Sequence, residues 1–199
     1  MTDRPEVSNL RGGGRKELLR SLPESHVLHT ITQEHEHITG FLRELDTQRN
    51  QLVQKATLNE SRSILDDIRH SAELLLDTES HHIREEEVVC LELERMHISG
   101  PAETLRREHN LLRPLKRRLL DLTTIGSEKM EFNTLQAEIN GVIDRVICNY
   151  LLHMQKEDDI LFPLVLENID DAAIWERMRI QCDEIGYCSF TPGAGIYRL

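Results

Sequence analysis

Apolar residues recur at helical spacing along most of the chain. The clearest stripe runs through residues 132–164 and contains Leu135, Ile139, Val142, Val146, Ile160 and Leu164. An α-helix places positions three or four apart on one face, so we expect this face to pack into a core. His153 and Glu157 fall on the same stripe, one turn apart. An inward-facing titratable group is costly unless it is paired or bound to a metal. The pair is therefore the first candidate for chemistry.

The same periodicity predicts other helices along the chain. We expect a first helix over about 23–53 and a long second helix over 58–97, with Thr57 as its cap. A third helix begins at Pro101, a residue well suited to a first helical turn, and is followed by a loop over 123–129. The fourth is the helix described above. Asp170 or Asp171 is predicted to cap a shorter last helix over 172–185.

Helical geometry separates the four histidines of the first predicted helix. His35 falls on the stripe formed by Leu28, Ile31, Ile38, Leu42 and Leu45. At about 100° per residue, His26, His29 and His37 point at least about 120° away from that stripe. We therefore expect His35 to be buried and the other three to lie at the surface.

The second and third predicted helices carry further inward-facing groups. His82 and Glu86, four residues apart, fill a gap in the apolar stripe of the second helix. His81 points to the flank of that stripe, and Glu85 lies at its edge. On the third helix His109 falls on the inner face.

The two halves of the chain repeat one pattern. Each half predicts a helical hairpin with one lone inward histidine on its first helix and a His-x-x-x-Glu pair on its second. Two such hairpins form an all-α, antiparallel four-helix bundle, an architecture whose core can hold metal ions between facing helices. Imidazoles with carboxylates suit iron, with manganese and zinc as alternatives, and two carboxylates able to bridge indicate two ions.

Four motifs together closely resemble those of the hemerythrin-like, or HHE cation-binding, family over about residues 25–168. They are Ile31-x-x-Glu34-His35-x-x-Ile38, His82-x-x-x-Glu86-Glu87, Leu105-x-x-Glu108-His109-x-x-Leu112 and His153-x-x-x-Glu157-Asp158-x-x-Leu161-Phe162-Pro163. The resemblance implies a non-haem centre of two iron ions with carboxylate bridges. The implied ligands are His35, His82, Glu86, His109, His153 and Glu157.

The chain departs from the oxygen-carrying hemerythrins at two positions. Those proteins have a second histidine on the third helix, where this chain has Arg113. They also place an aspartate five residues after the last histidine, a spacing that Asp158 matches. Glu157 is preferred here because it repeats Glu86 and faces inward, with Asp158 as the competing ligand. The missing histidine implies an open coordination position or a water at one iron.

These departures make the chain more similar to bacterial and archaeal HHE proteins, some of which sense oxygen or redox state, handle nitric oxide or peroxide, or help repair iron–sulfur centres. We expect a protein that binds, senses or detoxifies O2, NO or peroxide. The alternatives are an iron–sulfur repair or redox enzyme, which would need an electron donor protein, and iron storage or buffering.

Charge and hydropathy restrict the partners. The formal net charge of −11 argues against nucleic acid or an anionic membrane as the main partner. No apolar run is long enough to span a bilayer, and the N-terminus lacks an apolar signal core, so we expect a cytoplasmic protein.

We divide the chain into an N-terminal arm (1–22), a bundle (23–168) and a C-terminal helix with a tail (169–199). Cys182 and Cys188, near the C-terminus, are interpreted as ordinary thiols, with a redox pair as the alternative.

Overall fold

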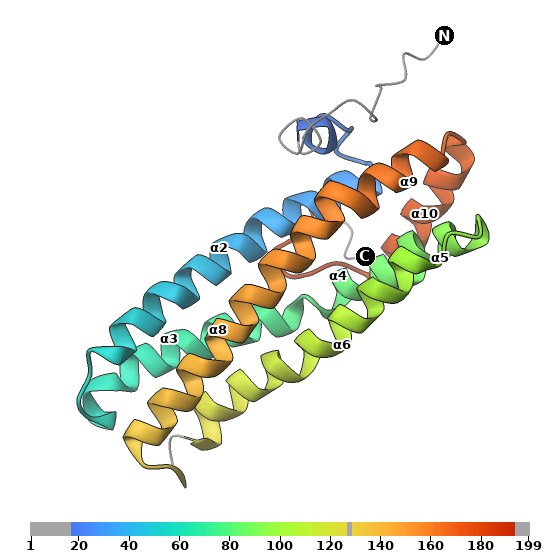
Figure 1. The fold of residues 1–199 in the computed structure, drawn as a ribbon. Coiled ribbons are helices and arrows are strands. Elements are labelled where there is room, and N and C mark those ends of the chain that lie inside the picture. Colours follow the sequence, from blue (N-terminus) through green and yellow to red (C-terminus); the bar gives the residue numbers. More distant parts are fainter. Residues whose placement is uncertain (1–16, 127–128, 194–199) are drawn as a thin grey trace. The chain divides into compact units, whose positions relative to one another are not determined.

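The computed structural model describes residues 17–126 and 129–193. All regular elements in these ranges are helices, and no strand occurs among them (Figure 1). The chain forms two compact units, described separately below. The first unit comprises residues 1–36, 80–105 and 153–199, and the second comprises residues 37–79 and 106–152. Three long helices contribute a segment to each unit: α2 (Val27–Val53), α6 (Gly100–Asp121) and α8 (Phe132–Lys156).

The second unit contains α3 (Leu58–Asp77) and the adjoining parts of the three long helices. The Thr57 side chain accepts a hydrogen bond from the Glu60 amide, so the predicted cap is confirmed. Figure 1 shows α3 turning back along α2 after a short connection. Buried stripe residues form its core, namely Ile38, Leu42, Leu45, Ile64, Ile68, Leu75, Leu135, Ile139, Val142 and Val146. The predicted loop at 123–129 instead begins as a π-helix, η3 (Leu122–Gly126), and residues 127–128 lie outside the described range.

Thr78 joins two buried polar side chains in the second unit. Its hydroxyl lies 2.8 Å from the Tyr150 hydroxyl and accepts a hydrogen bond from Lys116 Nζ at 3.0 Å. Both partners are fully buried. Nearby in sequence, Arg113 donates to Glu79 at 2.7 Å. Arg113, which replaces an expected histidine, thus takes part in an ion pair.

In the first unit two helices are interrupted by π-helical turns. The single helix predicted over 58–97 is divided into α3, α4 (Glu79–Arg84), the π-helix η2 (Glu85–Val89) and α5 (Cys90–Arg95). Likewise α8 passes through the π-helix η4 (Glu157–Leu161) into α9 (Phe162–Asn168). A π-turn adds one residue to a helical turn, which rotates the following side chains relative to an α-helical count. The prediction that Ile160 faces the core is therefore wrong: Ile160 is 59% exposed and Leu161 is buried.

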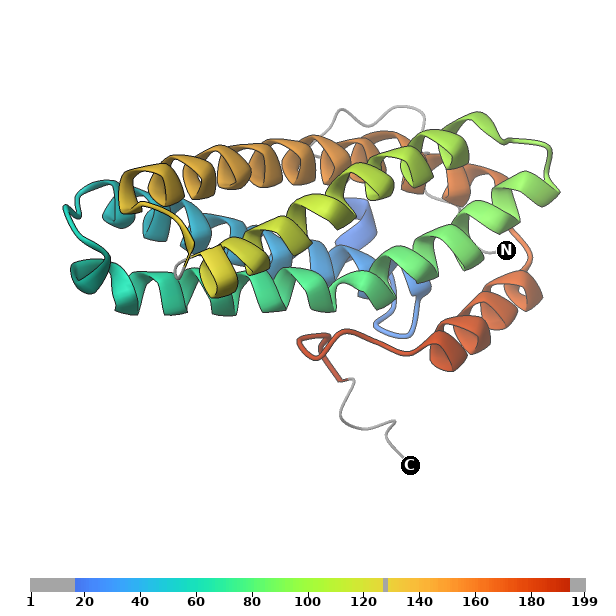
Figure 2. The ribbon, with the colours of Figure 1, turned by 90° about the horizontal axis from the view of Figure 1, so that it is seen from below.

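The last helix, α10 (Ala172–Ile185), belongs to the first unit. Asp171 caps it by accepting a hydrogen bond from the Ala173 amide, as predicted. Met178 and Cys182 enter a buried apolar cluster that also contains Val88, Leu93, Ala102, Phe162 and Val165. Figure 2 shows the chain continuing past the end of α10 as an irregular segment. This C-terminal segment (residues 186–191) brings Cys188 and Thr191 to buried positions.

Most of the predicted N-terminal arm, residues 1–16, lies outside the described range. Residues 17–20 form a short helix whose Leu19 is fully buried in the same apolar cluster. The three-part division of the chain stays a prediction. Over the described residues, no helix has the length and apolar character needed to cross a membrane.

Candidate metal centre

The first unit gathers imidazoles and carboxylates away from solvent. All of the following side chains belong to residues that are at most 4% exposed: Glu34, His35, His81, His82, Glu85, His153, Glu157 and Asp158. They come from α2, α4, η2, α8 and η4. Burial of so many titratable groups is costly unless each finds a partner of opposite charge, a hydrogen bond or a metal.

Glu157 lies between two of the predicted histidine ligands. Its Oε2 is 3.2 Å from His35 Nε2, and its Oε1 is 3.1 Å from His153 Nε2. Both carboxylate oxygens are buried, yet within the described part of the chain neither has a partner that meets hydrogen-bond geometry. A carboxylate in this position presents one oxygen to each imidazole.

The second nitrogen of His35 is held by Asp158, whose Oδ1 lies 3.0 Å from His35 Nδ1. Burial opposes a charge on this imidazole, but the contacts with Asp158, Glu157 and Glu85 outweigh it and raise the pKa of His35 well above its ordinary value. The Phe162 ring stacks on His35 at 5.7 Å between centroids. Asp158 thus contacts the outer side of the imidazole, and Glu157 contacts the inner side.

Glu85, the first residue of the π-helix η2, lies in the cluster. Among the described residues, Glu85 offers a ligand atom within 4.8 Å of those of His153 and Glu157, and it also groups with His35 and His81. Glu85 is fully buried, whereas Glu86 is half-buried and enters none of these groups. Glu86 as a ligand stays a prediction without support from this geometry.

His82 and His153 lie close together, as the paired His-x-x-x-Glu motifs predict. Their ring centroids are 6.0 Å apart, and each offers a nitrogen within 4.8 Å of the other's. Both are buried. His109 lies on α6 in the second unit and is also fully buried, and its role as a ligand stays a prediction.

Sequence reasoning missed His81. It was expected on the flank of its helix, but it is 1% exposed, with Nε2 3.3 Å from Glu85 Oε1. Its Nδ1 lies 2.7 Å from Glu34 Oε2. Arg84 donates to both oxygens of Glu34, at 2.6 and 2.8 Å. Burial opposes the charge on Glu34, but His81 and Arg84 overcome it and lower the pKa of Glu34 to about 2.

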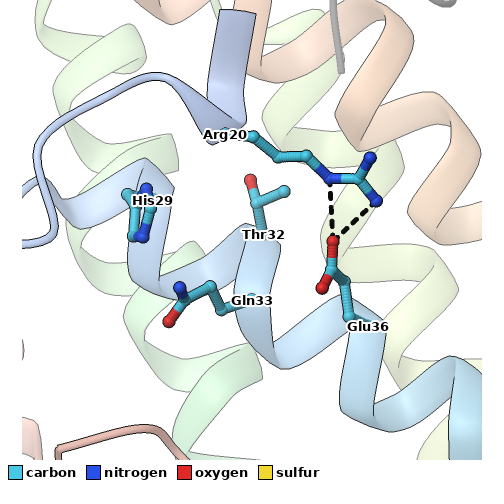
Figure 3. Close-up of a pocket in the computed structure, with 5 residues that line it drawn as sticks. All are labelled: Arg20, His29, Thr32, Gln33 and Glu36. Carbon is cyan, nitrogen blue, oxygen red and sulfur yellow. Dashed lines mark hydrogen bonds and ion pairs between the residues drawn. The ribbon is translucent and has the colours of Figure 1, made fainter. Parts of the chain in front are cut away.

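The other histidines of the first helix divide differently from the prediction. His37 is exposed, as expected, and His26 is half-buried against the Trp175 ring at 4.3 Å. The expectation that His29 lies at the surface is wrong, because His29 is only 8% exposed. It lines a pocket of about 410 Å³ together with Arg20, Thr32, Gln33 and Glu36. Figure 3 shows Arg20, from the short helix at 17–20, reaching across this pocket to Glu36.

The cluster fits a bound cation better than it fits an ordinary polar core. The Glu157 carboxylate is held beside two imidazole nitrogens without hydrogen-bond geometry, an arrangement that a cation among these atoms would satisfy. The donor set of imidazole nitrogens and carboxylate oxygens is the one that iron, manganese and zinc accept. His35 also has the carboxylate on its outer nitrogen that metal-binding histidines commonly show.

A comparison with known families identifies the fold. Residues 26–165 match the family model described as the hemerythrin HHE cation-binding domain. No curated protein matches the sequence significantly. The match and the helices together confirm the predicted all-α, hemerythrin-like helical bundle. Because the family model covers most of the chain, the chain belongs to the hemerythrin HHE cation-binding domain family.

Proposed function

We propose that the protein holds two iron ions in the cluster of the first unit and uses them to bind, sense or detoxify a small ligand: O2, NO or peroxide. The observation that carries the proposal is the position of Glu157, with one oxygen toward His35 and the other toward His153. A carboxylate between two sets of imidazoles is suited to bridging two ions.

Glu85 supports a second bridge. It belongs to one group with His35 and His81 and to another with His153 and Glu157. The proposed ligands of the first unit are therefore His35, His82, His153, Glu85 and Glu157. Asp158 orients His35 through Nδ1. His109 stays a ligand implied by the family motif.

Bound iron would supply the redox chemistry and a coordination position for the small ligand. The protein's own contribution is to exclude water and fix the donor atoms, since the groups of the cluster are nearly inaccessible to solvent. The proposal favours a ligand as small as O2 or NO, because a larger substrate would have to displace packed side chains such as Phe162.

The experiment that tests the proposal is a measurement of metal content on the full chain purified without air. The absorption spectrum is recorded before and after oxygen is added, and the reduced protein is then titrated with NO. About two irons per chain, with a new near-ultraviolet absorption band on oxidation and saturable NO binding, are expected. Zinc alone, or a folded protein that takes up no iron, would overturn the proposal.

A measurement of peroxide turnover distinguishes a protein that only binds the small ligand from one that consumes it. The iron-loaded protein is supplied with peroxide and a chemical electron donor. Stoichiometric binding without turnover supports sensing, whereas sustained consumption of peroxide supports detoxification. Iron uptake far beyond two per chain would favour storage over either role.

A further inference from the structure

The pocket beside α2 shares no residue with the metal cluster. It is lined by Arg20, His29, Thr32, Gln33 and Glu36, and we call it the α2 pocket. Its volume of about 410 Å³ lies in the range of small-molecule binding sites. All five residues belong to the first unit. Figure 3 shows four of them on α2 and Arg20 reaching over from the short helix at 17–20.

His29 is the most unusual residue of the α2 pocket. Its side chain is buried, and neither ring nitrogen has a hydrogen-bond partner within the described part of the chain. A neutral imidazole has one N–H donor and one acceptor nitrogen, and leaving either group buried and unpaired costs free energy. The fold therefore keeps, at the wall of a pocket, a polar group that a bound molecule would satisfy.

The other lining residues offer both donors and acceptors of hydrogen bonds. The amide of the half-buried Gln33 has an oxygen that accepts and an NH2 group that donates. Thr32 already donates its hydroxyl proton to the Leu28 carbonyl at 2.7 Å, so its oxygen can only accept from a ligand. Arg20 Nε donates to Glu36 Oε1 at 2.8 Å, and their opposite charges cancel. This lining matches an uncharged molecule that both donates and accepts.

The Arg20–Glu36 ion pair lies on the solvent side of the pocket. The two side chains are 63% and 54% exposed, and an exposed ion pair contributes little to stability. The pair can therefore open at small cost and admit a molecule to His29. A ligand group that reaches the buried imidazole must itself be uncharged, since a charge there would be buried without an opposite charge beside it.

We propose that the α2 pocket binds a small uncharged molecule with several hydroxyl groups, a polyol or a monosaccharide, through His29 and Gln33. Each hydroxyl group donates one hydrogen bond and accepts others, so it can pair with either imidazole nitrogen and with the amide. The inference does not depend on the proposed function, because the two sites have no residue in common. In the competing interpretation, His29 is a core residue whose unpaired nitrogens are tolerated, and the pocket holds only water.

The test uses the full chain with Zn²⁺ added as a diamagnetic ion, and glycerol, inositol and glucose as probes. Calorimetric titration measures binding, and nitrogen NMR of the histidine rings shows whether the His29 signals shift. We expect saturable binding of at least one probe at about one site per chain, together with a shift of the His29 ring nitrogens. Acetate and glycine, which carry charges, should not bind at this site. Binding of either of them in place of all three hydroxylated probes would overturn the proposed ligand class.

Three variants give the test a matched control. His29→Leu should abolish binding, and without ligand it should resist urea at least as well as the wild type, because an unpaired buried group is removed. Gln33→Leu should weaken binding by about 3–10-fold, the effect of one uncharged hydrogen bond. His37→Ala, an exposed change on the same helix, should match the wild type. Equal affinity in the wild type and His29→Leu, or in Gln33→Leu if His29→Leu does not fold, would overturn the inference, as would the absence of saturable binding by every probe.

Discussion

Glu157 Oε1 lies 3.1 Å from Nε2 of His153, one turn earlier on the same helix. Its neighbour Asp158 instead contacts Nδ1 of His35, the nitrogen on the outer side of that ring. Glu157 and Asp158 therefore have different positions in the centre. Glu157→Gln should therefore lower iron content strongly, whereas Asp158→Asn should keep the iron and bind it about 10–100-fold more weakly. Metal analysis and chelator competition on both variants measure this difference. Greater iron loss in Asp158→Asn than in Glu157→Gln would reverse the assignment.

Glu85 and Glu86 provide a matched pair of variants on one π-helix. Glu85→Gln removes a charge from the buried cluster, and we expect it to lose iron. Glu86→Gln changes a half-buried residue and should leave iron content near that of the wild type. Iron per chain, measured after identical loading, checks both variants. The opposite ranking would show that Glu86, the predicted ligand, holds the iron in place of Glu85.

His82→Ala and His153→Ala should each reduce both iron content and thermal stability. Metal binding contributes to the free energy of unfolding when only the folded state assembles the site. Calorimetry with and without a chelator separates the two effects, because the chelator should lower the melting temperature of the wild type more than that of either variant. Full iron loading in both variants would exclude them as ligands.

The Thr78 network of the second unit makes a prediction about stability alone. Thr78→Val removes one hydrogen-bond partner from the buried Tyr150 hydroxyl and from Lys116 Nζ. We expect the free energy of unfolding to fall by about 0.5–1.5 kcal/mol for each of the two hydrogen bonds that is lost. Urea denaturation measures the change, and the exposed Thr47→Val is the control. A Thr78→Val variant as stable as Thr47→Val would show that the network contributes nothing.

The environment of His26 predicts that the free energy of unfolding depends on pH. Burial, assisted by repulsion from His29, lowers the pKa of His26 from 6.5 to about 4. Its Nδ1 also accepts a hydrogen bond from the Leu28 amide, which protonation would remove. The unfolded chain therefore binds more protons between these pH values, so the contribution of His26 to stability falls as the pH drops from about 6.5 toward 4.

Urea denaturation at several pH values measures this slope, with His26→Gln as the comparison. The fluorescence of Trp175, the single tryptophan of the chain, follows protonation of the adjacent ring. A fluorescence midpoint near pH 6.5, or an equal slope in His26→Gln, would contradict the prediction.

The periodic apolar positions predicted where the long helices lie, and the residue types before them predicted the caps at Thr57 and Asp171. The burial of His35, His82 and His153 followed from the same counting. What the counting could not find is the extra residue in a π-turn, because a single added residue leaves the composition and the nearby apolar spacing almost unchanged. This explains why Ile160 was placed in the core.

The π-turns do not account for the unexpected burial of His29 and His81. His29 lines a pocket together with Arg20 from a separate helix, and His81 is held by Glu34 from α2. These contacts join segments far apart in the chain, so the face of a single helix does not reveal them. Thr191 is the most distant example, since its hydroxyl reaches Glu34 from the far end of the described chain.

The two π-turns have a consequence for engineering. Each begins at a carboxylate of the cluster, Glu85 in η2 and Glu157 in η4. Deleting one residue inside either turn would allow an uninterrupted α-helix with more regular hydrogen bonds, while rotating the side chains that follow the carboxylate, Asp158 beside His35 among them. A screen for a higher melting temperature of the metal-free chain would therefore select such deletions. The selected variants would have the lowest affinity for iron.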